Sequence, residues 1–150
     1  MRATYAPPQR REGSSLPKYE INEDNRIVAL ETFGIVIAGQ VGGVVDGEHN
    51  LSQYGLSWIS YNSSVTGDAM VFDDANLLGS CHLIDQSLAY GQSTLFGNVL
   101  MQADSRAFGS CRLRGATVVP GNAWVFGEAV VENTTLASGD RIGGFTRIGL

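Results

Sequence analysis

From Trp58 to Arg141 the chain reads WISYNS, SVTGDA, MVFDDA, NLLGSC, HLIDQS, LAYGQS, TLFGNV, LMQADS, RAFGSC, RLRGAT, VVPGNA, WVFGEA, VVENTT and LASGDR. These are fourteen consecutive segments of six residues without an insertion. The second position, from Ile59 to Ala137, is always apolar, and the fourth is Gly in nine segments. The sixth is small (once Val) in every segment except the last, where Arg141 stands. A fixed short period predicts a solenoid built from stacked coils.

Each segment predicts a short strand followed by a sharp corner. Side chains of a strand alternate between its two faces, so an inward second position leaves the first and third outside. Gly, Asn and Asp at the fourth and fifth positions tolerate the positive φ that a corner requires. A small sixth side chain fits where the chain re-enters the interior. We expect three strands to close a triangular coil of 18 residues, with successive coils about 4.8 Å apart.

A second period supports the 18-residue coil. Aromatic side chains recur at this interval in the third, outward position: Tyr54, Phe72, Tyr90, Phe108 and Phe126. The first positions of the same face hold Met70, Leu88, Arg106 and Trp124. We expect the rings to stack and the face to be an interface, because monomers rarely expose so large an apolar strip. Its occupant stays open between a homotrimer with this face inward, cover by residues 19–51, and a different partner.

The hexads resemble those of the hexapeptide-repeat (LpxA-like) left-handed parallel β-helix superfamily. The style of Val119-Pro120-Gly121-Asn122-Ala123 is most similar to its YdcK-like branch, whose members generally have no assigned activity. The lead-in from Gly42 to Ile59 is similar as well, so the resemblance covers roughly residues 42–141. It implies a left-handed coil, which the general preference for right-handed parallel crossovers would not predict.

The resemblance also implies an alternative function. Acyltransferases of this superfamily are typically trimers that bind an acyl donor between neighbouring prisms and use a histidine as general base. This chain departs from them, because it has only His49 and His82, no loop pushed out between the hexads, and Gly two places after the aliphatic residue. His82 takes an outward first position between Ser64 and Leu100, where we expect a surface or interface histidine.

The residues give little support for other site chemistry. The γ-carbonic anhydrases share this architecture but need three histidines, so we predict no metal and no cofactor. Cys81 and Cys111 take small inward positions on different edges of different coils, and we expect two buried free thiols, consistent with a reducing compartment. Asp73-Asp74 falls at a corner, where turn formation explains it. We predict no catalytic residue.

The residues before the hexads form two segments. Residues 19–57 predict a short-strand cap, with β-branched runs at 19–21, 26–30 and 34–37 separated by turn residues at 22–25 and 39–43. Residues 1–18 contain three of the four prolines and show no periodicity, so they have no core of their own. We expect this extended arm to be ordered by docking on a partner. The docking residues we predict are Arg2, Tyr5, Pro7, Pro8, Arg10 and Arg11.

Charge and hydropathy exclude several classes of partner. The chain carries a net charge of −5, and no Lys or Arg lies between Ile27 and Ser105. Nucleic-acid binding needs clustered cations, so we expect none by the body of the protein. No apolar run approaches a membrane span, and no secretory signal opens the chain. We therefore expect synthesis in the cytoplasm.

Together these patterns predict an all-β chain. Its fold is a single-stranded left-handed parallel β-helix of about five coils at 58–150, a cap at 19–57 and an arm at 1–18. The function we predict is non-enzymatic: a homotrimeric prism docked through its arm on a larger assembly, such as a phage capsid decoration (cement) protein or fibre component of a virion. The alternative is a hexapeptide-repeat acyltransferase with an acyl-donor site between subunits.

Overall fold

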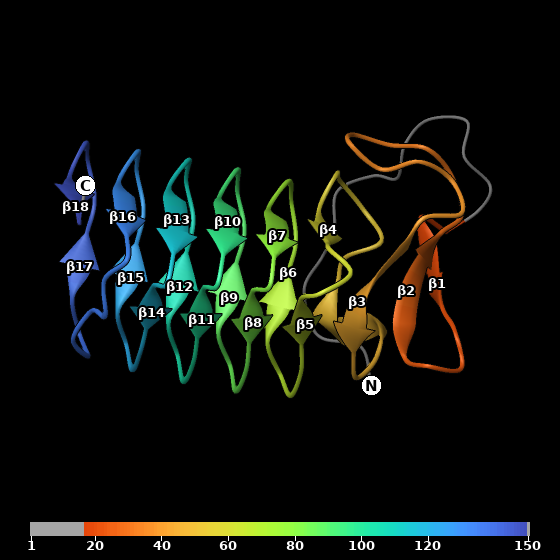
Figure 1. Ribbon diagram of the computed structural model, residues 1–150, viewed down its shortest axis with the longest axis horizontal. Coiled ribbons are helices and arrows are strands. Elements are labelled where there is room, and N and C mark those ends of the chain that lie inside the picture. The colour runs from red at the N-terminus through yellow and green to blue at the C-terminus, as the bar shows by residue number, and fades with distance from the viewer. Residues whose placement is uncertain (1–16, 150) are drawn as a thin grey trace.

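A computed structural model describes residues 17–149. This part of the chain is all-β, with stacked parallel strands about 18 residues apart that form a β-solenoid of about six turns. Figure 1 shows the coils side by side along the long axis, with the cap at one end and the C-terminus at the other. A single 3₁₀ turn, η1 (Glu48–Asn50), is the helical element of the described residues. The prediction of the fold class is confirmed.

Three sheets make the faces of the prism. Face A runs in the order β1 (Tyr19–Ile21), β2 (Arg26–Ala29), β3 (Val41–Val45), β5 (Ser64–Val65), β8 (His82–Leu83), β11 (Leu100–Met101) and β14 (Val118–Val119). Face C runs in the order β6 (Met70–Val71), β9 (Leu88–Ala89), β12 (Arg106–Ala107), β15 (Trp124–Val125) and β17 (Arg141–Ile142). Face D runs in the order β4 (Trp58–Ile59), β7 (Asn76–Gly79), β10 (Thr94–Gly97), β13 (Arg112–Gly115), β16 (Val130–Glu132) and β18 (Arg147–Ile148).

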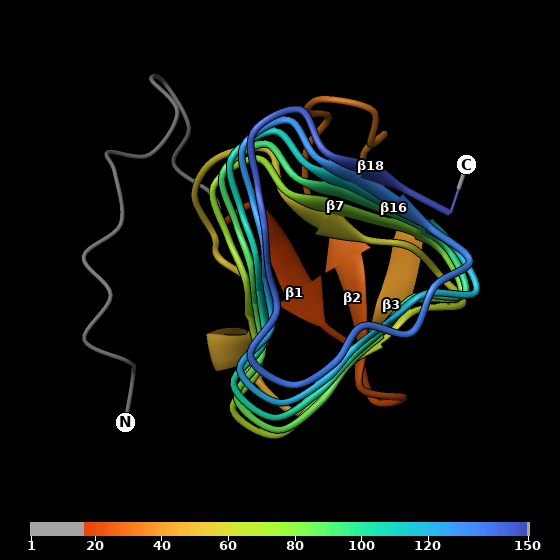
Figure 2. The same cartoon turned by 90° about the vertical axis from the view of Figure 1, so that its left-hand side faces the viewer.

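The coil is left-handed. Figure 2 views the prism from its C-terminal end, with the last coil nearest the reader. That coil passes along β18 at the top toward the C-terminus at the right, which is clockwise, while the chain advances toward the viewer. A clockwise path toward the viewer is a left-handed turn, so the handedness implied by the resemblance is confirmed.

The interior is a single column of apolar side chains. Every second-position residue from Ile59 to Val131 is 0% exposed. The small sixth positions from Ser63 to Ala129 are also buried. Each inner side chain is enclosed by all three faces, so the alternation of inward and outward residues holds in every coil. The predicted core is confirmed over this range.

The corners depend on left-handed backbone conformations. Gly91, Gly109 and Gly127 have φ of 69°, 73° and 65°, and they stack directly on one another in successive coils. A Cβ added to Gly91 would lie 2.9 Å from the backbone nitrogen of Gly109, which is closer than packing allows. Asp73 and Asp85 adopt the same region, at 57° and 60°. Glycine at these corners therefore allows both the positive φ of the turn and the close approach of successive coils.

The cap differs from the prediction in two places. Residues 34–37 form no strand, because Phe33 and Val36 pair across a tight turn. The supposed turn at 39–43 instead contributes to strand β3, which pairs antiparallel with β2 and parallel with β5. Gly42 and Gly43 are needed there for space. A Cβ on Gly42 would lie 2.7 Å from the Trp58 ring, and one on Gly43 would lie 2.3 Å from Ser63 O.

Lys18, the last residue of the predicted arm, belongs to the core of the cap. Its side chain is fully buried, and Nζ donates a hydrogen bond to Ser57 O at 2.9 Å. The ammonium also lies 5.0 Å from the ring centroid of Phe33, which in turn meets Trp58 edge to face at 5.7 Å. The described chain is therefore anchored from Lys18 onward.

The solenoid begins before the predicted first hexad. Val45 pairs with Val65, and Leu51 forms a bridge with Val71, so both stand in the inner column. Both pairs are offset by two residues more than the 18-residue step that joins Ile59 to Leu77. The corner at 52–57 accommodates the two additional residues. This extra coil explains why the solenoid has about six turns and not about five.

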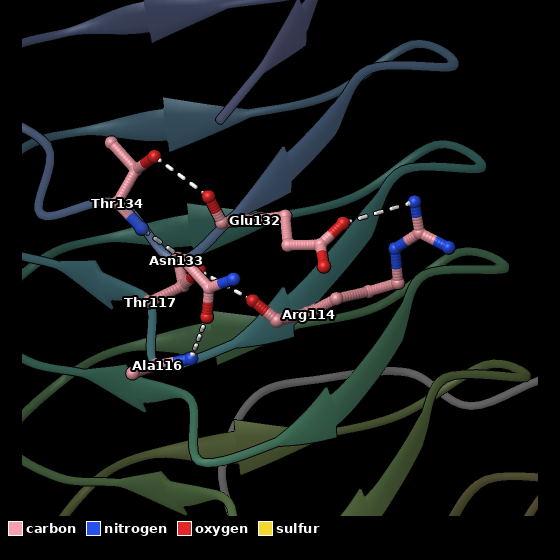
Figure 3. A network of polar contacts seen from close by, with 6 residues as sticks. All are labelled: Arg114, Ala116, Thr117, Glu132, Asn133 and Thr134. Atoms are coloured by element: carbon pink, nitrogen blue, oxygen red, sulfur yellow. Dashed lines mark hydrogen bonds and ion pairs between the residues drawn. The ribbon is translucent and has the colours of Figure 1, made fainter. Parts of the chain in front are cut away.

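The last corner between faces D and A is one residue shorter than the others (Figure 3). Asn133 turns the chain with φ of 51°, and its Oδ1 accepts a hydrogen bond from Ala116 N at 2.9 Å. Thr135 pairs with Val118, and Leu136 becomes the buried residue. The amide of the corner asparagine thus bonds to the preceding coil and allows the chain to omit a residue.

This deletion corrects the last predicted hexad. Ala137 was expected inside and is exposed, whereas Leu136 takes the inner position. From there the inner column continues at Ile142 and Ile148. Arg141, which broke the pattern at a sixth position, is a first-position residue of face C paired with Trp124. The hexads therefore continue to Ile148 after a shift of one residue.

Candidate functional site

A ladder of stacked rings runs along the outside of face C, and we call it the ring ladder. Phe72 and Tyr90 lie 4.8 Å apart between centroids, Tyr90 and Phe108 5.2 Å, and Phe108 and Phe126 5.3 Å. Their planes are within 9° of parallel. The spacing follows from the parallel register of β6, β9, β12 and β15, which places equivalent side chains one coil apart. The predicted stacking is confirmed for these four rings.

Tyr54 does not occupy the fifth position of the ladder. Because of the longer corner at 52–57, Leu51 pairs with Val71 and Ser52 N donates to Val71 O. Ser52 is therefore the ladder neighbour of Phe72 in register, and Tyr54 lies two residues further along the corner. The interval of 18 residues was real in the sequence but misleading here, since the coil that contains Tyr54 is longer.

At the other end the ladder closes with a glycine. Gly143 takes the position above Phe126, and a Cβ there would lie 2.3 Å from the ring. The face is continued instead by the first-position column, in which Arg106, Trp124 and Arg141 pair in register. The guanidinium carbons of Arg106 and Arg141 lie 5.1 and 4.3 Å from the indole centroid, on successive coils. The indole also meets Phe108 edge to face at 5.8 Å.

The other predicted residues of this face, Met70 and Leu88, precede Arg106 in the same column. Both are half-buried, as are the four stacked rings and Trp124. Stacked rings cover one another's faces and leave their edges at the surface. Face C therefore presents a continuous strip of ring edges and aliphatic side chains, bordered at the C-terminal end by two arginines.

A hollow borders face C at its corner with face A. It has a volume of about 360 Å³ and is lined by Gln86, Asp104, Arg106, Asn122, Trp124 and Arg141. Arg141 is oriented by hydrogen bonds from its Nη1 to the backbone oxygens of Asn122, Gly139 and Asp140. Arg106 lines the same hollow, and within residues 17–149 no acidic side chain forms an ion pair with it.

A second, smaller hollow of about 190 Å³ lies at the opposite edge of face C, at its corner with face D. It is lined by Ser110, Arg112, Glu128, Val130 and Arg147. Arg112, Val130 and Arg147 stand in register on three successive coils, as Arg106, Trp124 and Arg141 do at the first edge. Glu128 precedes Val130 at the corner and is exposed.

Charge is segregated along the axis of the prism. The coils before residue 105 contain Asp46, Asp68, Asp73, Asp74 and Asp85 without a single Lys or Arg. The coils after it contain five arginines: Arg106, Arg112, Arg114, Arg141 and Arg147. Arg114 forms an ion pair with Glu132 on face D, with 3.4 Å between Nη2 and Oε1 (Figure 3). The remaining four arginines line the two hollows at the edges of face C.

The histidines lie away from the ring ladder. His82 stands between Ser64 and Leu100 on face A, as predicted, and is exposed. Its Nδ1 lies 2.6 Å from Ser64 Oγ, a hydrogen bond that the sequence did not indicate. His49 Nε2 lies 2.8 Å from Gly67 O at a corner of the first coil. Neither hollow at the edges of face C includes a histidine.

The two cysteines are buried and free, as predicted. Burial raises the pKa of the Cys111 thiol to about 12, and it raises the pKa of Cys81 as well. Both thiols therefore stay protonated at neutral pH and behave as small apolar side chains. Within residues 17–149 no group of three His, Cys, Asp or Glu side chains is arranged to hold a metal ion. No helix of that segment is long and apolar enough to cross a membrane.

Comparison with other proteins adds no assignment. No protein-family model matches the chain, and no curated protein matches it significantly. The predicted docking residues Arg2, Tyr5, Pro7, Pro8, Arg10 and Arg11 lie outside the described part of the chain. The hexad pattern did not indicate that Arg141 belongs to face C. Its Trp124 contact could have been found only by detecting the one-residue deletion at Asn133, which precedes it.

Proposed function

We propose that this protein is a non-enzymatic structural protein whose rigid prism self-associates through face C. The observation that carries the proposal is the ring ladder. Its four parallel rings, together with Leu88 and Trp124, form an apolar strip along the outside of the coil. A contiguous strip of this kind marks an interaction surface, because monomers seldom expose one. A homotrimer with face C toward the threefold axis would cover the strip on every copy.

The position of the cap favours association over cover by the same chain. Residues 19–51 extend face A and close the N-terminal end of the prism (Figure 1). Phe33 packs on Trp58 there. Residues 19–51 do not run along strands β9, β12 and β15, which carry this part of the ladder. Cover by residues 19–51, one of the three occupants left open by the sequence, is therefore disfavoured for this part of the ladder. We propose a second copy of the chain as the occupant.

The arm gives the proposal its second part. Residues 1–16 carry Arg2, Arg10 and Arg11 against a single acid, Glu12. A basic, proline-rich segment suits docking on an acidic surface of a larger assembly, such as a capsid shell, after synthesis in the cytoplasm. The protein would then be a decoration (cement) protein or fibre component of a virion. The hexads resemble those of the hexapeptide-repeat superfamily, YdcK-like branch, and the proposal includes membership of that branch.

The test has two arms. Sedimentation velocity of the full chain should give a trimer, and a monomer at about 100 µM would contradict self-association. A variant that lacks residues 1–16 should remain trimeric but no longer join the assembly in the native source. The deletion ends at residue 16 because Lys18 is part of the cap core. Attachment that is unchanged in this variant would rule out the arm as the docking segment.

One observation keeps a second candidate, a hexapeptide-repeat acyltransferase. The Ser64 hydroxyl at 2.6 Å from Nδ1 orients the His82 ring and leaves Nε2 directed away from that bond, as a general base requires. Calorimetric titration with acetyl-CoA distinguishes the two functions. Saturable micromolar binding that is lost in His82→Ala would favour the enzyme, and no binding would favour the structural protein.

A further inference from the structure

We propose that the two edges of face C are complementary halves of one contact, so that the edge facing A on one copy pairs with the edge facing D on the next. This inference rests on the proposed self-association and names the groups that direct it. The partner is a second copy of this chain, placed parallel to the first around a threefold axis.

The edge toward face A presents cations held in place by the indole. Arg106 and Arg141 lie on either side of Trp124 in register, within the hollow of about 360 Å³. Arg141 is fixed by three backbone oxygens, and Arg106 forms no ion pair with an acid of residues 17–149. A guanidinium pair preorganised in this way suits a carboxylate, since little side-chain entropy is lost on binding.

The edge toward face D presents a carboxylate at the matching height. Glu128 follows Trp124 in the same coil, at the opposite end of face C. It therefore lies between the levels of Arg106 and Arg141, which belong to the coils below and above. Coils are about 4.8 Å apart, so a carboxylate at this level reaches both guanidinium groups of a parallel neighbour. Glu128 is exposed, and within residues 17–149 it forms no ion pair.

A second pair of opposite charges joins the same two edges, but here the acid lies at the edge toward face A and the arginine at the edge toward face D. Asp104 lines the larger hollow, at the edge toward face A, and it belongs to the coil before that of Trp124. Arg112 lines the hollow on the second edge and follows Asp104 closely in the same coil. A parallel neighbour thus brings Asp104 toward Arg112 while it brings Glu128 between Arg106 and Arg141. Arg147 also lines the second hollow, one coil beyond Glu128, so each edge carries two arginines and one acid. The levels of the two acids then set the register of the copies along the axis.

The arrangement also selects the symmetry. A contact between two different edges is heterologous, and it closes into a ring when the rotation between copies completes a circle. Three triangular prisms that turn face C toward a common axis meet in this way, edge to edge. An antiparallel dimer would instead place these arginines against the acidic coils around Asp73 and Asp85, and it would leave Glu128 beside no arginine of the partner. The two arrangements therefore predict different partners for Glu128.

Charge exchange tests the pairing. Arg106→Glu, Glu128→Arg and the double variant should each be folded by circular dichroism and compared with the wild-type chain by sedimentation velocity. We expect each single variant to weaken association at least about tenfold, because like charges then face each other. The double variant should recover association to within about threefold of wild type. Exchange of Arg114 and Glu132, which pair within one chain on face D, is the matched control and should leave association unchanged.

Each outcome decides between the two proposals. A monomeric wild type overturns the proposed self-association and this inference with it. A wild-type trimer whose single variants associate normally, or whose double variant is not restored, overturns the edge pairing alone. A wild-type dimer overturns the parallel threefold contact in favour of the antiparallel one. Arg106→Gln serves as a second variant, since it removes the charge without introducing repulsion and should weaken association less than Arg106→Glu.

Discussion

The inner column and the ring ladder repeat with the same coil, yet they differ in how each side chain is surrounded. Val71, Ala89 and Ala107 are 0% exposed because three faces enclose them. Phe72, Tyr90 and Phe108 stand next to them in the chain, but they lie outside the coil, where they are half-buried and stack on their neighbours in the ladder. The backbone register fixes the position of both sets. The difference in enclosure decides what each set contributes. The inner column stabilises the folded coil, whereas we expect the ring ladder to stabilise association between copies.

The largest expected effect breaks the inner column. Val71→Asp would place a carboxylate at a fully buried position of the inner column, so we expect the free energy of unfolding to fall by about 3–5 kcal/mol. Urea unfolding followed by circular dichroism measures this. Gln102→Asp is the control, since Gln102 stands at an outward position of face A. A Val71→Asp protein as stable as this control would contradict the closed interior.

The next effect breaks the ladder without breaking the coil. Phe108→Ser removes a ring that stacks on Tyr90 and Phe126, and we expect a loss of about 1–2 kcal/mol in stability together with dissociation of the oligomer. Phe96→Ser on face D is the control, because Phe96 is also at an outward third position and is 55% exposed. Sedimentation velocity should show the control still associated. If both variants associate equally well, another face makes the contact.

A third prediction uses pH to probe the enclosure of a corner. Burial raises the pKa of Cys111 to about 12 from its ordinary value of 9.0. The folded state then holds a proton that the unfolded state releases above pH 9, so stability is complete below pH 9 and falls as the pH rises toward 12. Thermal melting across this range should show the fall, with a slope of up to about 1.4 kcal/mol per pH unit. Cys111→Ala should reduce the slope and leave the part that comes from Cys81, whose pKa burial also raises, and an unaltered slope would contradict this assignment.

The smallest effect separates two inner serines. Ser105 Oγ is buried and has no hydrogen-bond partner among residues 17–149, whereas Ser87 Oγ donates to Ile84 O at 2.8 Å. Replacing an unpaired buried hydroxyl removes a desolvation cost, so Ser105→Ala should raise the free energy of unfolding by about 1 kcal/mol. Ser87→Ala should lower it by a similar amount. Chemical denaturation of both variants compares them directly, and equal shifts would show that the hydroxyl of Ser105 is paired.

The repeat could be predicted because it is a local property of the chain. The alternation of Val125 with Trp124 and Phe126 already states which side chains face inward. The glycines at the corners indicate where the chain turns. Neither inference needs knowledge of another coil, since each follows from the geometry of a strand and a turn.

The candidate site was predicted in part. The ring ladder from Phe72 to Phe126 follows from the regular coil, and the structure contains it. Tyr54 was placed wrongly because the corner at 52–57 is longer, and Arg141 was missed because the corner at Asn133 is shorter. Both corners are set by hydrogen bonds to the adjacent coil, which counting along one sequence does not reveal.

By itself, the sequence determined the length of a coil, the identity of the inner column and the aromatic character of one face. These follow from patterns of six and eighteen residues in which each position has one possible direction. The tertiary structure alone decided where the register shifts, how Gly42 and Gly43 admit the cap, and which arginines stand at each edge of the face. The reason is that these features depend on contacts between coils. At the corner of Asn133, for example, the side-chain amide accepts a hydrogen bond from the preceding coil, and the corner is one residue shorter.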